Sequence, residues 1–184
     1  MKIDWNAELC DQFRWHYENH LQPRLAGLTD EEYLWEPVPH CWSVRPRAEA
    51  VTPMAAGGGD MVADFVYPEP HPAPFTTIAW RLAHVTVGIF AMRNSTHFGA
   101  PAISYQTAVY PASADEALLA LDQAYRTWSS GIMQLDEEAL TRPVGAGEPF
   151  PEAPFAALIL HIHREAIHHL AEVLVLRDLY RLQG

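Results

Sequence analysis

The sequence predicts an all-α protein, an up-and-down four-helix bundle with a long proline- and glycine-rich excursion between the first and second helices. Two observations lead to this prediction. Apolar residues recur at helical spacing in four separate stretches, and segments rich in proline and glycine separate them. Because 184 residues with 49% hydrophobic content suffice for one buried core, we expect a single domain over residues 1–184.

The first predicted helix covers residues 3 to about 28, where apolar residues recur mainly every four positions. These residues are Ile3, Leu9, Phe13, Tyr17, Leu21 and Leu25. Pro23 is expected to bend or locally break the helix, and Gly27 is expected to end it. Residues 29–32 have the sequence of a capping box, which predicts one further short turn.

The excursion, residues 36–75, cannot form a regular helix because it holds eight prolines and the Gly57–Gly59 triplet. Residues 41–44 and 61–67 have the composition of β-strands, which favours a small hairpin. A long connection of this kind is typical of a lid over a site or of a segment partly ordered as strands.

Helical spacing returns after the excursion. The second predicted helix covers residues 76–94, with Thr76 or Thr77 as its cap and His84 in its middle. The third covers residues 113–135 and opens with a capping-box sequence.

The charge and the cysteine content of the chain indicate which classes of partner and which cellular compartment to expect. The formal net charge is −11 and the pI is about 5.2, and no cluster of basic residues is present, so we expect no nucleic-acid partner. No apolar run reaches membrane-spanning length, and the acidic start of the chain does not resemble a secretion signal. Two cysteines outside a CxxC motif fit a reducing compartment, so we expect a cytoplasmic protein.

The final predicted helix follows Pro154 and contains four of the ten histidines. His161, Glu165 and His169 are four residues apart, so they lie along one face of the helix, with His168 beside them. Polar groups on an otherwise apolar helix need partners, and a divalent metal is one partner that satisfies several of them together.

Sites in helical bundles form from inward side chains on facing helices, which makes His84 a partner for Glu165 and His169. Two imidazoles and one carboxylate leave coordination positions open, as in catalytic metal sites. In the alternative interpretation His84 is a hydrogen-bonded core residue, Glu165 pairs with an arginine such as Arg164 or Arg81, and His169 is only half buried.

The remaining histidines are weaker candidates. His16 and His20 are also four residues apart, but they belong to a predicted half-exposed helix edge. His163 is predicted to point away from the proposed site. The others lie in loops or at helix ends: His40, His71 and His97.

Two stretches carry a family resemblance: WRLAHV at Trp80–Val85 and REAIHHLAEVLVLRDLY at Arg164–Tyr180. Together they resemble the DinB-like superfamily, particularly its branch related to mycothiol-dependent maleylpyruvate isomerases, and the segment Trp35–Arg47 is similar to the one before the second helix in these proteins. The resemblance implies a four-helix bundle that holds a metal through His84, Glu165 and His169.

The same resemblance implies a thiol-dependent transferase or isomerase with one divalent ion, zinc or nickel being favoured and iron being compatible. The thiol would be a low-molecular-weight compound such as mycothiol, attacking a small electrophilic substrate. Two alternatives are a hydrolase that uses metal-activated water and a metal-stabilised binding or scaffold module without turnover.

Further residues are candidates for the surroundings of this site. His161 and His168 are expected beside the ligands, and Arg81, Trp42, Arg45 and Tyr125 are expected as substrate contacts. Apolar residues on all sides of the final helix indicate burial on more than one side, which favours a homodimer.

Overall fold

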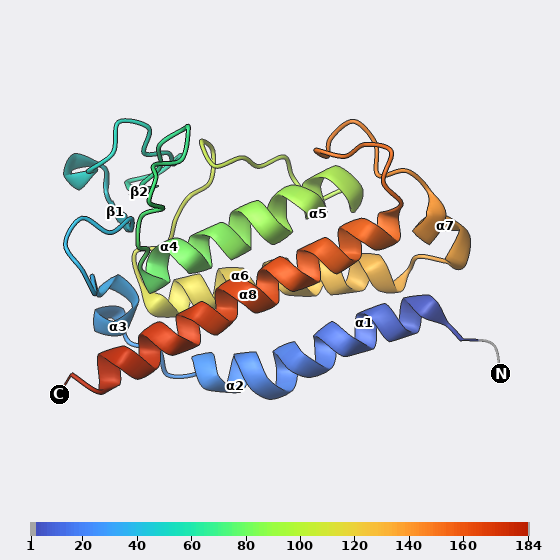
Figure 1. Cartoon of the computed structure of the whole chain (residues 1–184), viewed down its shortest axis with the longest axis horizontal. Coiled ribbons are helices and arrows are strands. Elements are labelled where there is room, and N and C mark those ends of the chain that lie inside the picture. The colour runs from blue at the N-terminus through green and yellow to red at the C-terminus, as the bar shows by residue number, and fades with distance from the viewer. Residues whose placement is uncertain (1–2, 184) are drawn as a thin grey trace.

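Residues 3–183 are described by a computed structural model of the chain, shown in Figure 1. Most of these residues are helical, and the only sheet they form has two strands. The elements are α1 (Trp5–His16), α2 (Gln22–Leu25), α3 (Asp30–Leu34), β1 (Val44–Pro46), β2 (Met61–Ala63), α4 (Ile78–Ala83), α5 (Met92–His97), α6 (Ala114–Met133), α7 (Glu137–Thr141) and α8 (Phe155–Arg181). The predicted all-α class is confirmed.

The first helix combines α1 and α2 through π-helical turns at Tyr17–Leu21. It begins where the Asp4 side chain accepts a hydrogen bond from the Ala7 amide. The wider π turns stand directly before Pro23, so the predicted local disturbance takes this form instead of a break. Gly27 has a φ of 67°, and this left-handed conformation ends the helix as predicted.

The second long helix consists of α4, π-helical turns at His84–Ala91 and α5. Thr77 caps it by accepting from the Trp80 amide. Both α4 and the π-helical turns pack against α8 and α6, and α1 packs against α6 as well (Figure 1). His84 therefore enters the interior of a bundle in which α8 is the facing helix.

The connection between the second and third helices departs from a simple up-and-down order. Asn94 in α5 donates to the Ala124 carbonyl in α6, and Phe98 packs its ring on Trp128 further along. The two helices therefore run in the same direction, and residues 98–113 return along the bundle (Figure 1). At roughly 3.3 Å per residue this loop is long enough to retrace a helix that rises roughly 1.5 Å per residue.

The predicted hairpin is present, but its first strand lies at Val44–Pro46 instead of residues 41–44, and its second strand ends at Ala63 instead of residue 67. Antiparallel pairing joins Val44–Pro46 with Met61–Ala63. The glycine triplet lies against the 98–113 loop, where the Gly58 amide donates to the Ala108 carbonyl at 2.7 Å. A Cβ on Gly57 would lie 2.6 Å from the Met61 carbonyl oxygen, so a side chain has no room there. The excursion is thus tied to the loop that carries Tyr105.

His163 belongs to the core of the bundle. Its ring stacks on Phe13 with centroids 4.4 Å apart, and its Nε2 accepts a hydrogen bond from Trp128 Nε1 at 3.1 Å. The residue is 6% exposed, and burial lowers the pKa of the imidazole to about 3.

This buried imidazole predicts a loss of stability in acid. Below the unfolded-state pKa of about 6.5 the unfolded chain binds a proton that folded His163 does not, so this residue alone lowers the free energy of unfolding by about 2 kcal/mol between pH 7 and pH 5. Other histidines of lowered pKa, such as His84, add to this fall. Urea titrations of chelator-treated protein at both pH values should show this fall, and the fall should be about 2 kcal/mol smaller in His163→Gln. His71→Gln, in an exposed loop, is the control; equal pH dependence in all three proteins would contradict the prediction.

Within residues 3–183, none of the helices is both long enough and apolar enough to cross a lipid bilayer.

Candidate functional site

His84 is held from two sides at the start of the π-helical turns. Its Nδ1 lies 3.0 Å from the Tyr105 hydroxyl, and its ring stacks on Trp80 with centroids 5.3 Å apart. π-helical turns shift the side chains that follow them and are frequent at functional sites. Because Tyr105 contacts Nδ1, a metal ion would bind His84 through Nε2.

Gly88, one turn after His84, makes the Tyr105 contact sterically possible. A Cβ at this position would overlap the Tyr105 hydroxyl and would lie 2.8 Å from the ring carbon Cζ. It would also lie 3.2 Å from His84 Nδ1. The absence of a side chain on Gly88 therefore lets a loop residue reach the imidazole of a helix residue.

His169 on α8 faces His84 across the bundle, with the two ring centroids 4.7 Å apart. Its Nδ1 lies 3.1 Å from Glu172 Oε2 and 3.1 Å from Arg81 Nη1, and Arg81 forms an ion pair with the same carboxylate. Its other nitrogen, Nε2, lies 3.7 Å from Glu165 Oε2. The three predicted ligand residues are therefore neighbours, and Glu172 orients the imidazole of one of them.

Glu165 uses its second oxygen differently. Glu165 Oε1 accepts hydrogen bonds from Arg164 at 3.0 and 3.2 Å and lies 3.6 Å from His161 Nδ1. Burial alone would raise the pKa of this carboxyl, but the bonds from Arg164 hold it below its usual value. The arginine pairing considered in the alternative interpretation occurs, and it occupies Oε1 while Oε2 faces His169.

The two half-buried imidazoles are neutral near pH 7. Burial, with a contribution from neighbouring His169, lowers the pKa of His84 to about 4. Burial also lowers the pKa of His169, although its hydrogen bond to Glu172 opposes this. Neutral imidazole is the form that binds metal ions.

Among the described residues, the group of three His, Cys, Asp or Glu side chains whose donor atoms all lie close enough to hold a cation is on α8 and differs from the predicted group. His168, His169 and Glu172 each offer one atom within 4.8 Å of the others. The His168 side chain is 63% exposed, compared with 15% for His169. The described residues thus form a possible His/Glu metal site, with His169 common to this outward group and to the inward group of His84, Glu165 and His169.

A pocket of about 440 Å³ opens onto this site. Its lining includes both His84 and His169. The size is in the range of small-molecule sites. The remaining walls come from the excursion and from the 98–113 loop, including Trp42, Phe65 and Tyr105. The excursion therefore closes one side of the pocket.

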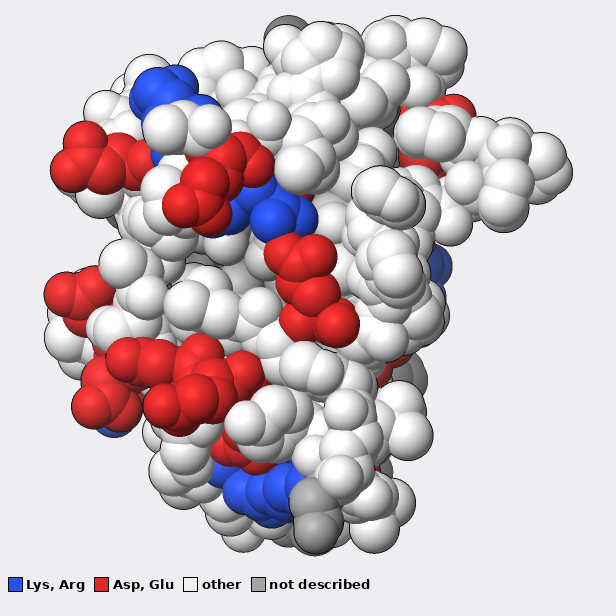
Figure 2. Space-filling view, turned by 90° about the vertical axis from the view of Figure 1, so that its left-hand side faces the viewer, with Lys and Arg blue, Asp and Glu red and all other residues white. Residues whose placement is uncertain are grey.

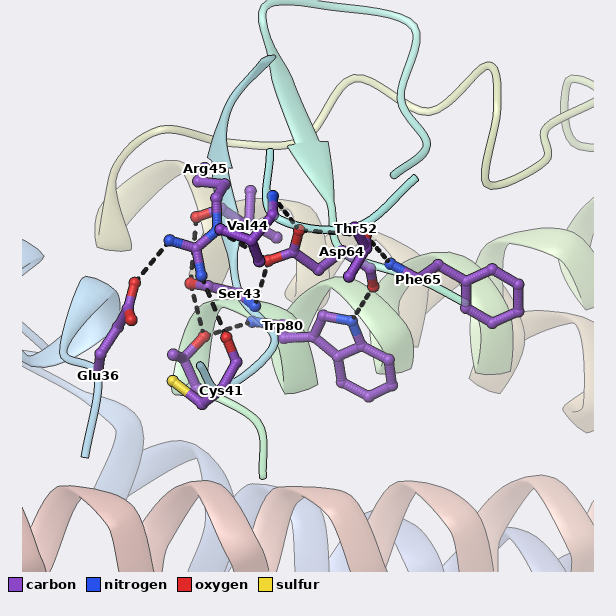
Figure 3. A network of polar contacts seen from close by, with 11 residues as sticks. Glu36, Cys41, Ser43, Val44, Arg45, Thr52, Asp64, Phe65 and Trp80 are labelled. Carbon is purple, nitrogen blue, oxygen red and sulfur yellow. Dashed lines mark hydrogen bonds and ion pairs between the residues drawn. The ribbon is translucent and has the colours of Figure 1, made fainter. Parts of the chain in front are cut away.

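Asp64, which is fully buried, fixes the shape of this part of the excursion (Figure 3). Its Oδ2 accepts from the Ser43 amide and from Arg45 Nε at 2.8 Å. Its Oδ1 accepts from the Val51 amide and the Thr52 hydroxyl. Both carboxylate oxygens are thus satisfied by groups of the excursion itself.

The same network joins the excursion to the bundle. The Asp64 carbonyl accepts from Trp80 Nε1 at 2.8 Å, so the hairpin is bonded to α4 one turn before His84 (Figure 3). Arg45 also pairs with Glu36 and donates to the Cys41 carbonyl. Arg45, expected as a substrate contact, lies in this network and is not among the described residues that line the pocket.

The other expected contacts lie in different places. Trp42 lines the pocket, whereas Arg81 is bound to Glu172. Tyr125 is buried, stacks on Tyr17 and donates its hydroxyl to Glu18.

Tyr105 and Asp64 were not predicted as residues of the site, because no motif or spacing in the sequence marks them. It also missed Glu172, which stands one helical turn after His169 and is visible in the sequence at the spacing of neighbouring side chains.

Two facing helices bring two histidines and a glutamate together beside a pocket. The protein is therefore a helical bundle with a candidate metal site. The sequence profile of the DinB superfamily matches residues 12–173, so this chain belongs to that superfamily. The predicted DinB-like resemblance is confirmed. Searches of curated proteins and of solved structures gave no match.

Proposed function

We propose that this protein is a divalent-metal-dependent, thiol-using transferase or isomerase, with His84, Glu165 and His169 as its metal ligands. The proposal rests on the hydrogen-bond partners of the two imidazoles, those of His84 and His169. In each of them Nδ1 has a partner outside the ligand group, the Tyr105 hydroxyl for His84 and Glu172 for His169. A metal-binding histidine commonly donates its other ring N–H to such a partner.

The proposal places the proton of both imidazoles on Nδ1, with Glu172 Oε2 as the acceptor at His169 and Arg81 directed to that same carboxylate. With a proton on Nδ1, His84 donates to the Tyr105 oxygen and His169 donates to the Glu172 carboxylate, which leaves both Nε2 lone pairs free. His169 Nε2 then faces Glu165 Oε2 at 3.7 Å. Two neutral nitrogens and one carboxylate oxygen form a donor set suited to zinc, nickel or iron and leave coordination positions open.

The inward group is favoured over His168, His169 and Glu172. In the outward group His169 would bind through Nδ1 and lose its hydrogen bond to Glu172, whose carboxylate also pairs with Arg81. His84 and His169 additionally line the pocket, whereas His168 is not among its described lining residues. A ligand group beside a pocket suits a reaction on a small molecule.

When bound, such a metal lowers the pKa of a thiol toward neutrality and supplies a nucleophile without a dedicated base. Trp80 and Tyr105 keep the His84 ring in place. A thiolate sulfur would form a bond to an electrophilic carbon of the substrate while the bond from that carbon to its leaving group breaks; the leaving group departs as an anion, and the thiol proton goes to solvent.

Metal analysis of protein purified without a metal-affinity column tests the ligand assignment. We expect about one divalent ion per chain, and we expect His84→Ala and His169→Ala to lose it. His168→Ala is the matched control, because it removes an exposed imidazole one residue from His169, and it should keep its metal. Metal lost in His168→Ala and kept in His84→Ala would instead establish the outward group.

The reaction class is tested on the metal-loaded protein. We expect mycothiol, bacillithiol or glutathione to react faster with a chlorodinitrobenzene in its presence, and His84→Ala to abolish the acceleration. Hydrolysis of ester or amide substrates without thiol would show that the metal activates water instead. Inactivity in both assays, with metal still bound, would indicate a binding or scaffold module.

A further inference from the structure

The pocket beside the metal site is walled largely by aromatic rings. The six aromatic residues that line it are Trp42, Phe65, Tyr67, Trp80, Tyr105 and Tyr110. The Trp42 ring lies 5.9 Å from Trp80 and 6.0 Å from Phe65, measured between centroids, and both pairs are tilted. Tilted rings around a space of this kind present π faces and edges to a bound group.

The charged side chains among the described residues that line this pocket are acidic. Among the described residues that line it, none is a lysine or arginine, and two are the carboxylates Asp64 and Glu69. The Asp64 carboxylate is occupied by the excursion network, so Glu69, which is exposed, is the free charge at the rim. Arg81 is not among the described lining residues, but its Nη1 lies 3.1 Å from Nδ1 of the lining residue His169 and pairs with Glu172.

The wider surface has the same sign. On the end of the molecule where α3 and the hairpin lie, acidic side chains gather in several clusters and basic side chains in smaller ones (Figure 2). The formal net charge of the chain is −11. A field of this sign raises the local concentration of cations and lowers that of anions.

From these observations we infer that the pocket binds a flat, apolar group that is cationic or uncharged, and that it rejects anionic groups of the same shape. The inference rests on the proposed function in placing the substrate in this pocket. Away from the metal ligands, a carboxylate would lose its hydration against aromatic rings without gaining a basic partner. A cation would keep a favourable contact with the ring faces. The part of the substrate that this aromatic wall holds is thus an aromatic-sized group that is neutral or cationic.

Three probes of similar shape separate the contributions of charge and ring: benzyltrimethylammonium, benzyl alcohol and benzenesulfonate. None of them is a strong metal ligand, so their binding can be measured by ligand-observed NMR both on metal-loaded and on chelator-treated protein. We expect benzyltrimethylammonium to bind about tenfold more tightly than benzenesulfonate, with benzyl alcohol between them. This order is expected on chelator-treated protein; on metal-loaded protein the preference for the cation should be smaller, because the bound ion adds positive charge beside the pocket.

Three variants test whether the probes bind in this pocket. Glu69→Gln should reduce the preference for the cation, and Tyr67→Ala, which removes a 75% exposed ring, should weaken all three probes. Phe150→Ala removes a ring that is 78% exposed and lies outside the pocket, and it should change nothing.

Equal affinity for cation and anion, tighter binding of benzenesulfonate, or loss of binding in Phe150→Ala would overturn the inference. Loss of metal in the ligand variants bears only on the proposed function, because the probes do not need the metal.

Discussion

Replacing Asp64 with alanine is expected to lower the free energy of unfolding by about 3 kcal/mol. The carboxylate accepts four hydrogen bonds within the excursion, and all four donors lose their partner at once. Arg45, whose side chain is 12% exposed, keeps only Glu36 as a counter-charge. Breaking a buried pair by removing one partner is costly because the remaining charge stays desolvated.

Urea titration monitored by circular dichroism measures this loss. Asp60→Ala removes an exposed aspartate of the same excursion and should change the free energy of unfolding by less than about 0.5 kcal/mol. Adding Arg45→Met to Asp64→Ala should recover part of the stability, because the uncompensated guanidinium is then absent. A double variant less stable than Asp64→Ala would show that Arg45 stabilises the excursion independently of Asp64.

The Asp64→Ala substitution should disturb the pocket even under conditions in which the helical bundle stays folded. The hairpin is bonded to α4 through the Asp64 carbonyl and Trp80 Nε1, and the segment that follows Asp64 carries Phe65 and Tyr67 into the pocket lining. Conditions that keep Asp64→Ala folded should therefore still weaken the binding of benzyltrimethylammonium.

Features that depend on nearby residues in the chain could be predicted from the sequence, and features that depend on distant residues could not. Helix limits depend on local signals, so the Thr29 capping box, the Thr77 cap and the Gly27 stop are where the sequence indicates. The spacing of Glu165 and His169 is equally local, because α8 fixes it.

The direction of the third helix and the surroundings of the site depend on contacts distant in the chain. Residues 98–113 can connect the helices in either direction, and only packing such as that of Phe98 on Trp128 selects one. Tyr105 reaches His84 because that loop returns along the bundle and Gly88 leaves room for it. Neither condition has a signature at a fixed spacing in the sequence.

Gly88→Ala is expected to weaken metal binding about 10- to 100-fold, the range found when a group that orients a metal-binding histidine is lost. The added methyl group would overlap the Tyr105 hydroxyl and crowd His84 Nδ1 at 3.2 Å. Tyr105 must then withdraw, and His84 loses the acceptor of its Nδ1 proton. Alanine gains up to about 1 kcal/mol of helix propensity over glycine, which offsets part of the packing strain and helps the variant to fold.

Competition with a chromogenic chelator measures the metal affinity of Gly88→Ala and of Tyr105→Phe. The second variant removes only the hydroxyl, so it loses the hydrogen bond to His84 without any steric change, and it should weaken binding in the same direction. Tyr67→Phe, which removes an exposed hydroxyl from the same pocket, should bind metal as the unmodified protein does. Weakened binding in Gly88→Ala combined with unchanged binding in Tyr105→Phe would mean that the methyl group displaces His84 directly, and that Tyr105 does not orient it.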